Sequence, residues 1–394
     1  MRSVGWVGSV RCFRPRFGAA VLTAALLIAG CDDSMAPADD DVLRFATLSA
    51  GQFQTCALTE SGMPFCWGQE IRLETDGDFV PVTRPMSMPG FPAFRDIAAG
   101  GFHGCGIDTT GRAWCWGVNF LGVLGVGTKE DSATPVQPLL DDDVVSLSAG
   151  LGHTCAVTTA GAAWCWGNGQ AGALGNGESG SFVSPAPVAV ESDLQFVEIG
   201  AAHGFSCGRT SGGRLYCWGL NQEGQVGDGT FDGRSVPVVV AGDISFSRFS
   251  MGSAHVCGID FEDRLFCWGS NFSGQLGNGS PEDSPVPVEP APAMRFAEVG
   301  AGNLHTCALT TNGKAYCWGR NTSGQLGDGT TEDRAAPVPV AGDVRFRAIT
   351  AGPSHSCGLT DRGVAWCWGR NSSGQLGDGS TIDRFVPAPV VAPE

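Results

Sequence analysis

The sequence predicts an all-β protein, a seven-bladed β-propeller made of repeats of about 50 residues. Two cysteines ten positions apart recur seven times, and the second of each pair is followed by Trp-Gly. The spacing between the first cysteines of successive units ranges from 49 (Cys56 to Cys105) to 52 (Cys155 to Cys207). The 394 residues include 59 glycines and 23 prolines, which indicates many turns and few long helices.

Residues 1–30 are typical of a secretory signal peptide. They carry no acidic residue, and an apolar stretch of about a dozen residues follows the last arginine, too short to span a bilayer. The basic residues are Arg2, Arg11, Arg14 and Arg16. Residues 27–31, Leu-Ile-Ala-Gly-Cys, resemble the lipobox of bacterial lipoproteins, which implies cleavage before Cys31 and lipid attachment to it. Ordinary signal cleavage with a free Cys31, or a retained anchor helix, are the alternatives.

Three parts of the chain are therefore expected: the signal peptide at 1–30, an acidic tether at 31–43 and the propeller at 44–394. The whole chain has 24 basic and 40 acidic residues, a formal net charge of −16. Removal of residues 1–30 takes away four basic residues and leaves a charge of about −20. Such an acidic chain repels phosphate backbones, so no nucleic-acid partner is expected.

Unit six shows the full repeat. It contains His-Thr-Cys-Ala-Leu at 305–309, Tyr-Cys-Trp-Gly at 316–319 and Gly-Gln-Leu-Gly-Asp-Gly at 324–329. Between the two cysteines lies Thr-Asn-Gly, a three-residue turn whose last position, Gly313, favours the left-handed conformation. The expected hairpin pairs Cys307 with Cys317, Ala308 with Tyr316, and Leu309 with Ala315.

This hairpin separates two kinds of side chain. One blade face carries the cysteine pair with small or aliphatic neighbours, and the other carries Tyr316 and Trp318. Because both faces of a propeller blade are buried against the adjoining blades, we expect the repeated tryptophans to form the core. We also expect the ring to be closed by a shared blade, in which residues 386–390 complete the sheet begun by residues 45–67.

These motifs resemble the repeats of the regulator of chromosome condensation family, over about residues 44–390. Kelch repeats have a similar period, but their double-glycine signature is absent from this sequence. The resemblance implies a seven-bladed propeller that acts by binding partners through its faces and rim loops. The eukaryotic founder of the family is a nucleotide-exchange factor for a nuclear GTPase and binds chromatin, a role that fits an exported acidic chain badly.

Disulfides are the favoured interpretation of the paired cysteines, because they are even in number, exported and opposite one another in the expected hairpins. Buried free thiols are the alternative. The expected pairs are Cys56–Cys66, Cys105–Cys115, Cys155–Cys165, Cys207–Cys217, Cys257–Cys267, Cys307–Cys317 and Cys357–Cys367.

Five units carry a histidine two positions before the first cysteine, and units one and four have Gln54 and Phe205 there. The histidines are His103, His153, His255, His305 and His355. His-x-Cys-x9-Cys offers three zinc ligands, but oxidising conditions and the two incomplete units favour a structural histidine that hydrogen-bonds loop backbone. No metal or cofactor is expected.

The Gly-Gln-Leu-Gly-Asp-Gly loops also suggest calcium, because carboxylate and amide oxygens are hard ligands. Asp228, Asp328 and Asp378 recur at one position. Asn176, Asn278 and Val126 replace them in other units, and a valine side chain cannot bind the ion. A turn-forming role is therefore favoured.

No catalytic residues are predicted, because the recurring residues are spread around the whole ring instead of converging at one place. Departures from the repeat are where a function would be sought, and those of the neighbouring units one and two form the candidate contact surface, with drift in an unconstrained loop as the alternative and no binding residue singled out. The departures are residues 69–94 of unit one (with Arg72, Glu74, Asp76, Asp78, Met86 and Met88), residues 120–124 of unit two and His203-Gly204-Phe205 of unit four.

The sequence thus favours a non-catalytic, lipid-anchored propeller of the bacterial cell envelope, on its periplasmic side or at the cell surface. We expect a monomer that binds a protein or a glycan and meets the membrane only through its anchor. A nucleotide-exchange-like regulator and a secreted glycan hydrolase are the alternatives. The hydrolase would need a pair of carboxylates in one cleft.

Overall fold

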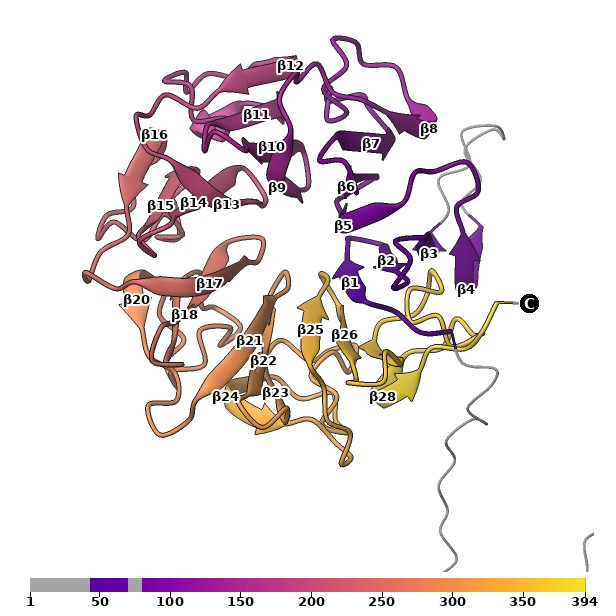
Figure 1. Ribbon diagram of the computed structural model, residues 1–394. Helices are drawn as coiled ribbons and strands as arrows, with labels where there is room; N and C mark the ends of the chain where they lie inside the picture. The colour runs from indigo at the N-terminus through magenta and orange to yellow at the C-terminus, as the bar shows by residue number, and fades with distance from the viewer. Residues whose placement is uncertain (1–42, 70–79, 394) are drawn as a thin grey trace, which may run out of the picture. The chain divides into compact units, whose positions relative to one another are not determined.

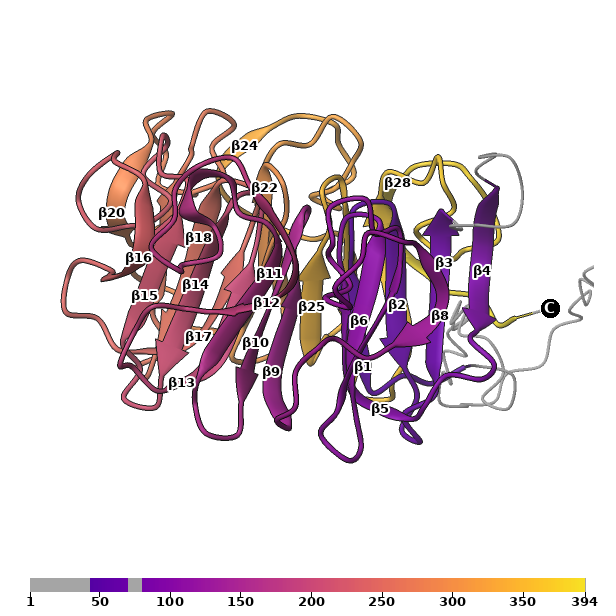
Figure 2. The ribbon, with the colours of Figure 1, turned by 90° about the horizontal axis from the view of Figure 1, so that it is seen from above.

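A computed structural model describes residues 43–69 and 80–393, which form seven four-stranded antiparallel sheets. The sheets are arranged as blades around a central axis (Figure 1), with their strands running roughly along that axis (Figure 2). This confirms the predicted seven-bladed β-propeller. The signal peptide, Cys31, nearly all of the tether and residues 70–79 of unit one lie outside the described residues.

Each blade contains four consecutive strands. Blades one to four contain β1 (Thr47–Ala50), β2 (Gln54–Leu58), β3 (Pro64–Gln69), β4 (Pro81–Ser87); β5 (Phe94–Ala99), β6 (His103–Asp108), β7 (Ala113–Gly117), β8 (Ser132–Val136); β9 (Val144–Ala149), β10 (His153–Thr158), β11 (Ala163–Asn168), β12 (Val183–Ala189); and β13 (Phe196–Ala201), β14 (Phe205–Thr210), β15 (Leu215–Gly219), β16 (Arg234–Val239). Blades five to seven contain β17 (Phe246–Met251), β18 (His255–Asp260), β19 (Leu265–Gly269), β20 (Ser284–Val288); β21 (Phe296–Ala301), β22 (His305–Thr310), β23 (Ala315–Gly319), β24 (Arg334–Pro339); and β25 (Ala348–Ala351), β26 (His355–Leu359), β27 (Ala365–Gly369), β28 (Arg384–Pro389). A 3-10 turn, η1 (Gln170–Gly172), follows β11.

Strand direction alternates within a blade, so the loops fall on two faces of the ring. The entry face, where the chain enters blade one at Leu43, carries the turns between second and third strands and the links between blades. The opposite face carries the loops from first to second and from third to fourth strands. In the part of the chain that the structure describes, no helix is long and apolar enough to cross a membrane.

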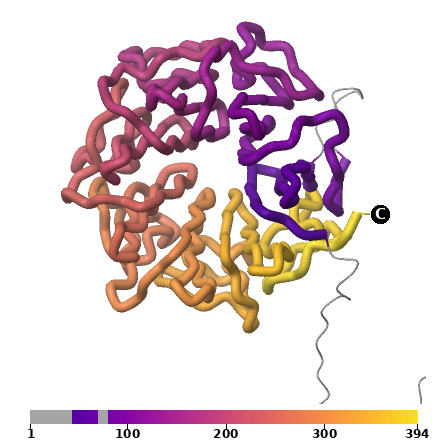
Figure 3. The backbone as a smooth tube through the Cα atoms, in the orientation of Figure 1, coloured from indigo at the N-terminus to yellow at the C-terminus, as the bar shows by residue number. Residues whose placement is uncertain are grey.

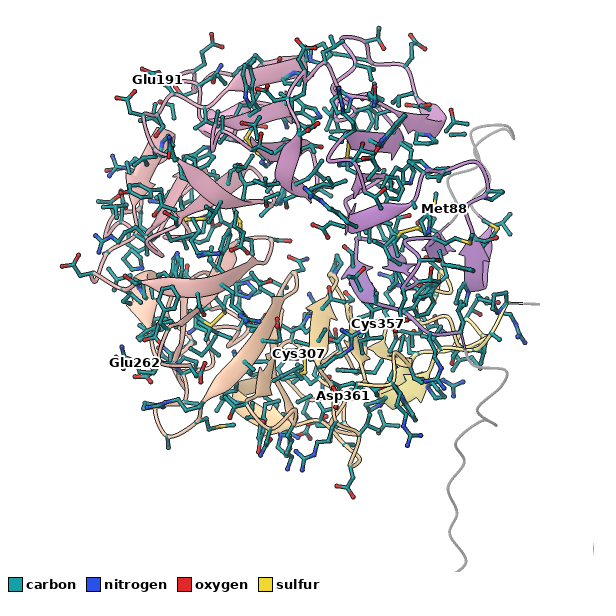
Figure 4. The ribbon with its side chains drawn as sticks, in the orientation of Figure 1. Met88, Glu191, Glu262, Cys307, Cys357 and Asp361 are labelled. Carbon is teal, nitrogen blue, oxygen red and sulfur yellow. A yellow bond between two sulfur atoms is a disulfide. The ribbon has the colours of Figure 1, made fainter. Side chains whose placement is uncertain are left out.

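The central hairpin of each blade has the predicted register. In blade six Cys307 pairs with Cys317, Ala308 with Tyr316 and Leu309 with Ala315. The turn residue Gly313 has φ +79°, as the three-residue loop requires. All seven cysteine pairs form disulfides across these hairpins, with Cα atoms 4.0–4.1 Å apart. Figure 4 shows two of them, at Cys307 and Cys357.

The tryptophans form the core between blades, as expected. Trp368 of blade seven is fully buried and packs on Leu309, Leu326 and the disulfide of blade six. Its ring also lies 5.9 Å from that of Phe346, measured between centroids, in its own blade. The aromatic face of one blade therefore fills the small-residue face of the preceding one.

The expected ring closure is wrong. Strand β28 pairs with β27, so it completes the last blade, and β4 completes the first. Blade one keeps a fourth strand of its own because residues 81–87 still follow its third strand, although the Gly-Gln-Leu-Gly run is missing. The two ends of the ring lie side by side (Figure 3) and are joined by contacts between blades, such as the Phe45 N–H donating to the Gly363 carbonyl at 2.8 Å.

Candidate functional site

The Asn-x-x-Gly-Gln-Leu-Gly-Asp-Gly loops are held by their own side chains. Asn321 Oδ1 accepts from the Leu326 N–H at 3.0 Å, and the Asp328 carboxylate forms an ion pair with Arg334 (Oδ2 to Nε, 3.1 Å). Although partial burial opposes it, hydrogen bonds from Thr330 and the pairing with Arg334 lower the pKa of Asp328. The equivalent Asp228 and Asp378 also pair with arginines, so these carboxylates already have partners and stabilise the loop.

Each of the five repeated histidines joins two blades. His255 Nε2 lies 2.9 Å from Thr306 Oγ1 of the next blade, and that hydroxyl donates to the Gln275 carbonyl at 2.9 Å. Because the hydroxyl hydrogen goes to the carbonyl, the imidazole Nε2–H is the donor to the hydroxyl. The indole of Trp318 donates to the same carbonyl at 2.9 Å. The histidines thus hydrogen-bond a side chain of the adjacent blade, which corrects the expected bond to loop backbone.

The histidine and its hydroxyl partner are lost together. At the first junction Gln54 stands in the histidine position and Gly104 in the hydroxyl position. At the fourth junction the corresponding residues are Phe205 and Val256, both fully buried. A buried hydroxyl with no donor facing it, or a histidine with no acceptor, would leave an unsatisfied polar group, so the two positions change as a pair.

Burial keeps these histidines neutral. It lowers the pKa of His103, His255 and His305 to about 3, and that of His153 and His355 to about 4. The cysteines of the His-x-Cys motif are all in disulfides, which removes the thiolates that a zinc site needs. In the described part of the chain, no group of three or more His, Cys, Asp or Glu side chains could hold a metal ion.

Carboxylates also lie on the innermost strands of the blades, around the central channel (Figure 1), where a hydrolase would be sought. Glu198 forms an ion pair with Arg209 (Oε2 to Nε, 2.7 Å), and Glu298 pairs with Arg248. Burial raises the pKa of Glu198 despite the arginine beside it. These two carboxylates are thus each paired with an arginine, an arrangement that differs from the free acid and base pair of a glycosidase. Asp96 stands at the equivalent position of β5, and burial raises its pKa.

A pocket of about 440 Å³ opens on the opposite face, over blades two to four. Its interior is apolar and includes Phe102, Leu121 and Leu151, while His203 and Gln170 lie at its polar rim. Both the volume and the apolar lining with a few polar groups are typical of binding pockets.

The pocket is hollow because two blades carry glycine where the others carry side chains. Gly152 and Gly204 each stand immediately before the histidine position of their blade. The equivalent residues are Leu304 in blade six and Ser354 in blade seven. The space over Gly152 is taken partly by Leu121 of the preceding blade, whose Cδ1 would lie 3.2 Å from a Cβ at that glycine. Adjacent blades therefore build the pocket together.

The sequence identified part of this site. Of the expected contact surface of units one and two, Phe120 and Leu121 line the pocket; His203 and Gly204 of unit four, which depart from the repeat but to which the sequence assigns no role, line it too. Met86, by contrast, is exposed on the outer strand β4 and takes no part in the pocket. Sequence reasoning missed Phe102, Leu151, Asn168, Gln170 and Leu220. Leu151 could have been noticed, because the same repeat position holds Ser253, Asn303 or Pro353 in blades five to seven.

Two family models of the regulator of chromosome condensation (RCC1) repeat match the chain. One matches residues 94–122, 144–173, 196–225, 246–275, 296–325 and 346–375, and the other matches 110–157, 160–208, 212–259, 262–309, 312–359 and 362–394. Neither match includes blade one, whose Gly-Gln-Leu-Gly run is missing. No curated protein sequence matches the chain.

Solved structures share the fold at low sequence identity. Prp20p from Saccharomyces cerevisiae superposes with a TM-score of 0.73 and 22% identity, covering 84% of this chain and 87% of that chain. Human WBSCR16 gives 0.72 and 21%, covering 82% and 88%. The CRINKLY WD40 ectodomain of the Arabidopsis thaliana receptor kinase ACR4 gives 0.53 and 18%, covering 89% and 98%.

Proposed function

The chain belongs to the RCC1 repeat family, and on this premise we propose that its propeller is a non-catalytic module that binds a protein partner in the pocket over blades two to four. The pocket itself carries this proposal, because apolar side chains gather there at positions where other blades carry mostly polar ones. Leu121 stands where blades five to seven have Ser273, Ser323 and Ser373. A partner that inserts an apolar side chain between Leu121 and Leu151 would remove both from water.

The outer rim of the ring is a poor place for a partner to add a strand. Every outer strand contains proline, which removes a backbone donor from an exposed edge. These prolines are Pro81 and Pro85, Pro135, Pro185 and Pro187, Pro237, Pro285 and Pro287, Pro337 and Pro339, and Pro387 and Pro389. The proposed partner therefore binds through side chains at a loop-lined face.

A protein partner is favoured over the other functions considered. The yeast relative Prp20p was studied for its binding to Gsp1p and histones, and proteins are the class of partner that we carry over to this chain. Nucleotide exchange has no support beyond the shared fold. Glycan hydrolysis would need free carboxylates, whereas Glu198 and Glu298 are paired with arginines.

The pocket predicts the outcome of an affinity capture. Leu121→Ser with Leu151→Asn installs the side chains of blade six, so the fold should be kept while the apolar surface is lost. Loss of the two leucines that the partner would bury should weaken partner binding at least about tenfold. The measurement is crosslinking capture from the native envelope, read by mass spectrometry, with crosslinks expected around the pocket.

The matched control is Ser323→Ala with Asn303→Ala, at the equivalent positions of blade six outside the pocket. Equal enrichment of the partner by both double variants, or crosslinks clustered on another surface, would refute the pocket. Binding on a glycan array that depends on Leu121 and Leu151, without any captured protein, would replace the protein partner by a glycan.

We further propose that the chain is exported and lipid-anchored at Cys31 in the cell envelope. The lipobox-like residues 27–31 support the anchor, and the seven disulfides indicate an oxidising compartment outside the cytosol. The N-terminal peptide of the native protein should begin at Cys31 with the mass of attached acyl chains. At high salt, which screens attraction between surface charges, Cys31→Ser should move nearly all of the protein from the membrane to the soluble fraction. An unmodified Cys31, or a different N-terminus, would contradict the anchor.

A further inference from the structure

Basic side chains gather on one sector of the entry face, formed by blades six, seven and one. We call them the basic arc. They are Arg44, Arg295, Lys314, Arg345, Arg347 and Arg362. All are exposed except Lys314, which is half-buried. The carboxylates in the turns and links of the same three blades are Glu60, Glu289, Asp343 and Asp361, so the six basic side chains still leave the sector positive in a chain whose net charge is strongly negative.

Hydrogen bonds show that the arc is one continuous surface. The Thr311 N–H donates to the Arg295 carbonyl at 3.2 Å, and the Arg345 guanidinium donates to Asn312 in the same turn at 3.3 Å. Arg347 donates to the Ala46 carbonyl at 2.9 Å, across the junction between the last blade and the first.

The junction between blades seven and one also forms the other end of the arc. Arg44 donates to the Arg362 carbonyl at 2.8 Å, which brings the turn of blade seven against the start of blade one. The arc thus surrounds the point where the chain enters the propeller at Leu43.

The rest of the entry face has the opposite charge. The links before blades three, four and five carry Asp141-Asp142-Asp143, Asp193 and Asp243, and the turn of blade five carries Glu262 and Asp263. Of these, Asp143 pairs with Arg112, Asp243 with Arg214 and Glu262 with Arg264, and the remaining aspartates leave the sector acidic overall. An anionic surface would attract the basic arc and repel the opposite sector.

We propose that the basic arc docks on the anionic lipid headgroups of the membrane that holds the protein. The proposal rests on the proposed lipid anchor for where it acts, since the twelve residue-to-residue steps from Cys31 to Leu43 span at most roughly 40 Å. A tether of that length keeps the arc close to the bilayer, where each basic side chain adds to the attraction. Because the pocket lies on the opposite face, this docking points the pocket away from the membrane, toward a partner.

The test uses the mature chain without its anchor residue, residues 32–394, so that binding does not depend on acylation. It should sediment with vesicles containing about one-third phosphatidylglycerol at low salt, and remain in solution with pure phosphatidylcholine vesicles. Arg345→Glu with Arg362→Glu should weaken binding to the anionic vesicles about tenfold or more. Arg320→Glu with Arg370→Glu changes the net charge equally on the opposite face and should leave binding nearly unchanged.

Absence of binding to the anionic vesicles, or equal loss in both double variants, would overturn the proposal. Binding by residues 43–394 but not by residues 32–394 would also overturn it, because the aspartates of the tether would then occupy the arc. Partner capture by the pocket and the mass of the Cys31 peptide should be unchanged in the arc variants. Failure of docking is thereby distinguished from failure of the proposed function.

Discussion

Acidification from pH 7 to pH 5 should lower the free energy of unfolding by on the order of 10 kcal/mol, comparable with the whole stability of a typical domain. The cause is the set of five buried histidines, exemplified by His255 with a pKa of about 3 and His355 with a pKa of about 4. In the unfolded chain each would titrate near pH 6.5. Below pH 6.5, unfolding is therefore coupled to the uptake of as many as five protons, because these histidines stay neutral in the folded protein.

The sign follows from the lowered pKa values. A histidine whose folded pKa is depressed contributes stability that is fully present above pH 6.5 and is lost as the pH falls toward its folded pKa of about 3 or 4. Asp328, with its lowered pKa, loses stability in the same direction but only below about pH 4. Asp96 and Glu198 have raised pKa values and so oppose the histidines over part of the range.

Urea unfolding at a series of pH values measures this effect, because the slope of the free energy against pH gives the number of protons taken up. The control is His355→Phe with Thr55→Val, which copies the natural pair at the junction of blades four and five. This double variant should fold and take up about one proton fewer, whereas His355→Phe alone leaves the Thr55 hydroxyl without its donor and should be less stable. A slope of one proton or less between pH 6.5 and pH 5 would contradict the prediction.

The repeat made the blade predictable because local rules and spacing agree. The three-residue turn ending at Gly313 sets the hairpin register, and that register places Cys307 opposite Cys317. The tryptophan core followed from the alternation of side chains across a blade whose faces are both covered. These inferences needed only residues close together in the sequence.

Contacts between blades were harder to predict, because they join residues about 50 positions apart. Each histidine contacts the residue that directly follows the histidine position of the next unit. The sequence indicates this pairing, because units without the histidine face a residue without a hydroxyl: Gln54 faces Gly104, and Phe205 faces Val256. This correlation becomes visible only when the histidine position of one unit is compared with the hydroxyl position of the next unit. The pocket was partly missed for the same reason, because Leu121 lies over Gly152, in a different blade.

Ring closure failed as a prediction because both closures satisfy the same sequence pattern. A strand after the last Trp-Gly can pair with its own blade or with the first, and the repeat phase does not distinguish the two. What decides is that residues 81–87 supply blade one with its own fourth strand. With that edge occupied, residues 384–389 complete blade seven.

A reductant should open one disulfide of the folded protein rapidly and the other six at least about a thousandfold more slowly. Cys66 is half-buried, whereas every other disulfide cysteine has no exposed surface. A thiolate must reach a sulfur atom to attack it, so the six enclosed pairs react only when their blade opens. Reduction with dithiothreitol under native conditions, followed by alkylation and peptide mapping, should therefore modify Cys56 and Cys66 first.

The slow phase should end in unfolding, because the bridges are worth about 2–3 kcal/mol each and their sum exceeds the usual stability of a domain. Cys56→Ala with Cys66→Ala should abolish the fast phase and leave the slow one. Cys307→Ala with Cys317→Ala should keep the fast phase and cost about 2–3 kcal/mol in urea unfolding. Reduction of all seven pairs at one rate in the folded protein would mean that the blades open together, and the enclosure of the six pairs would then not protect them.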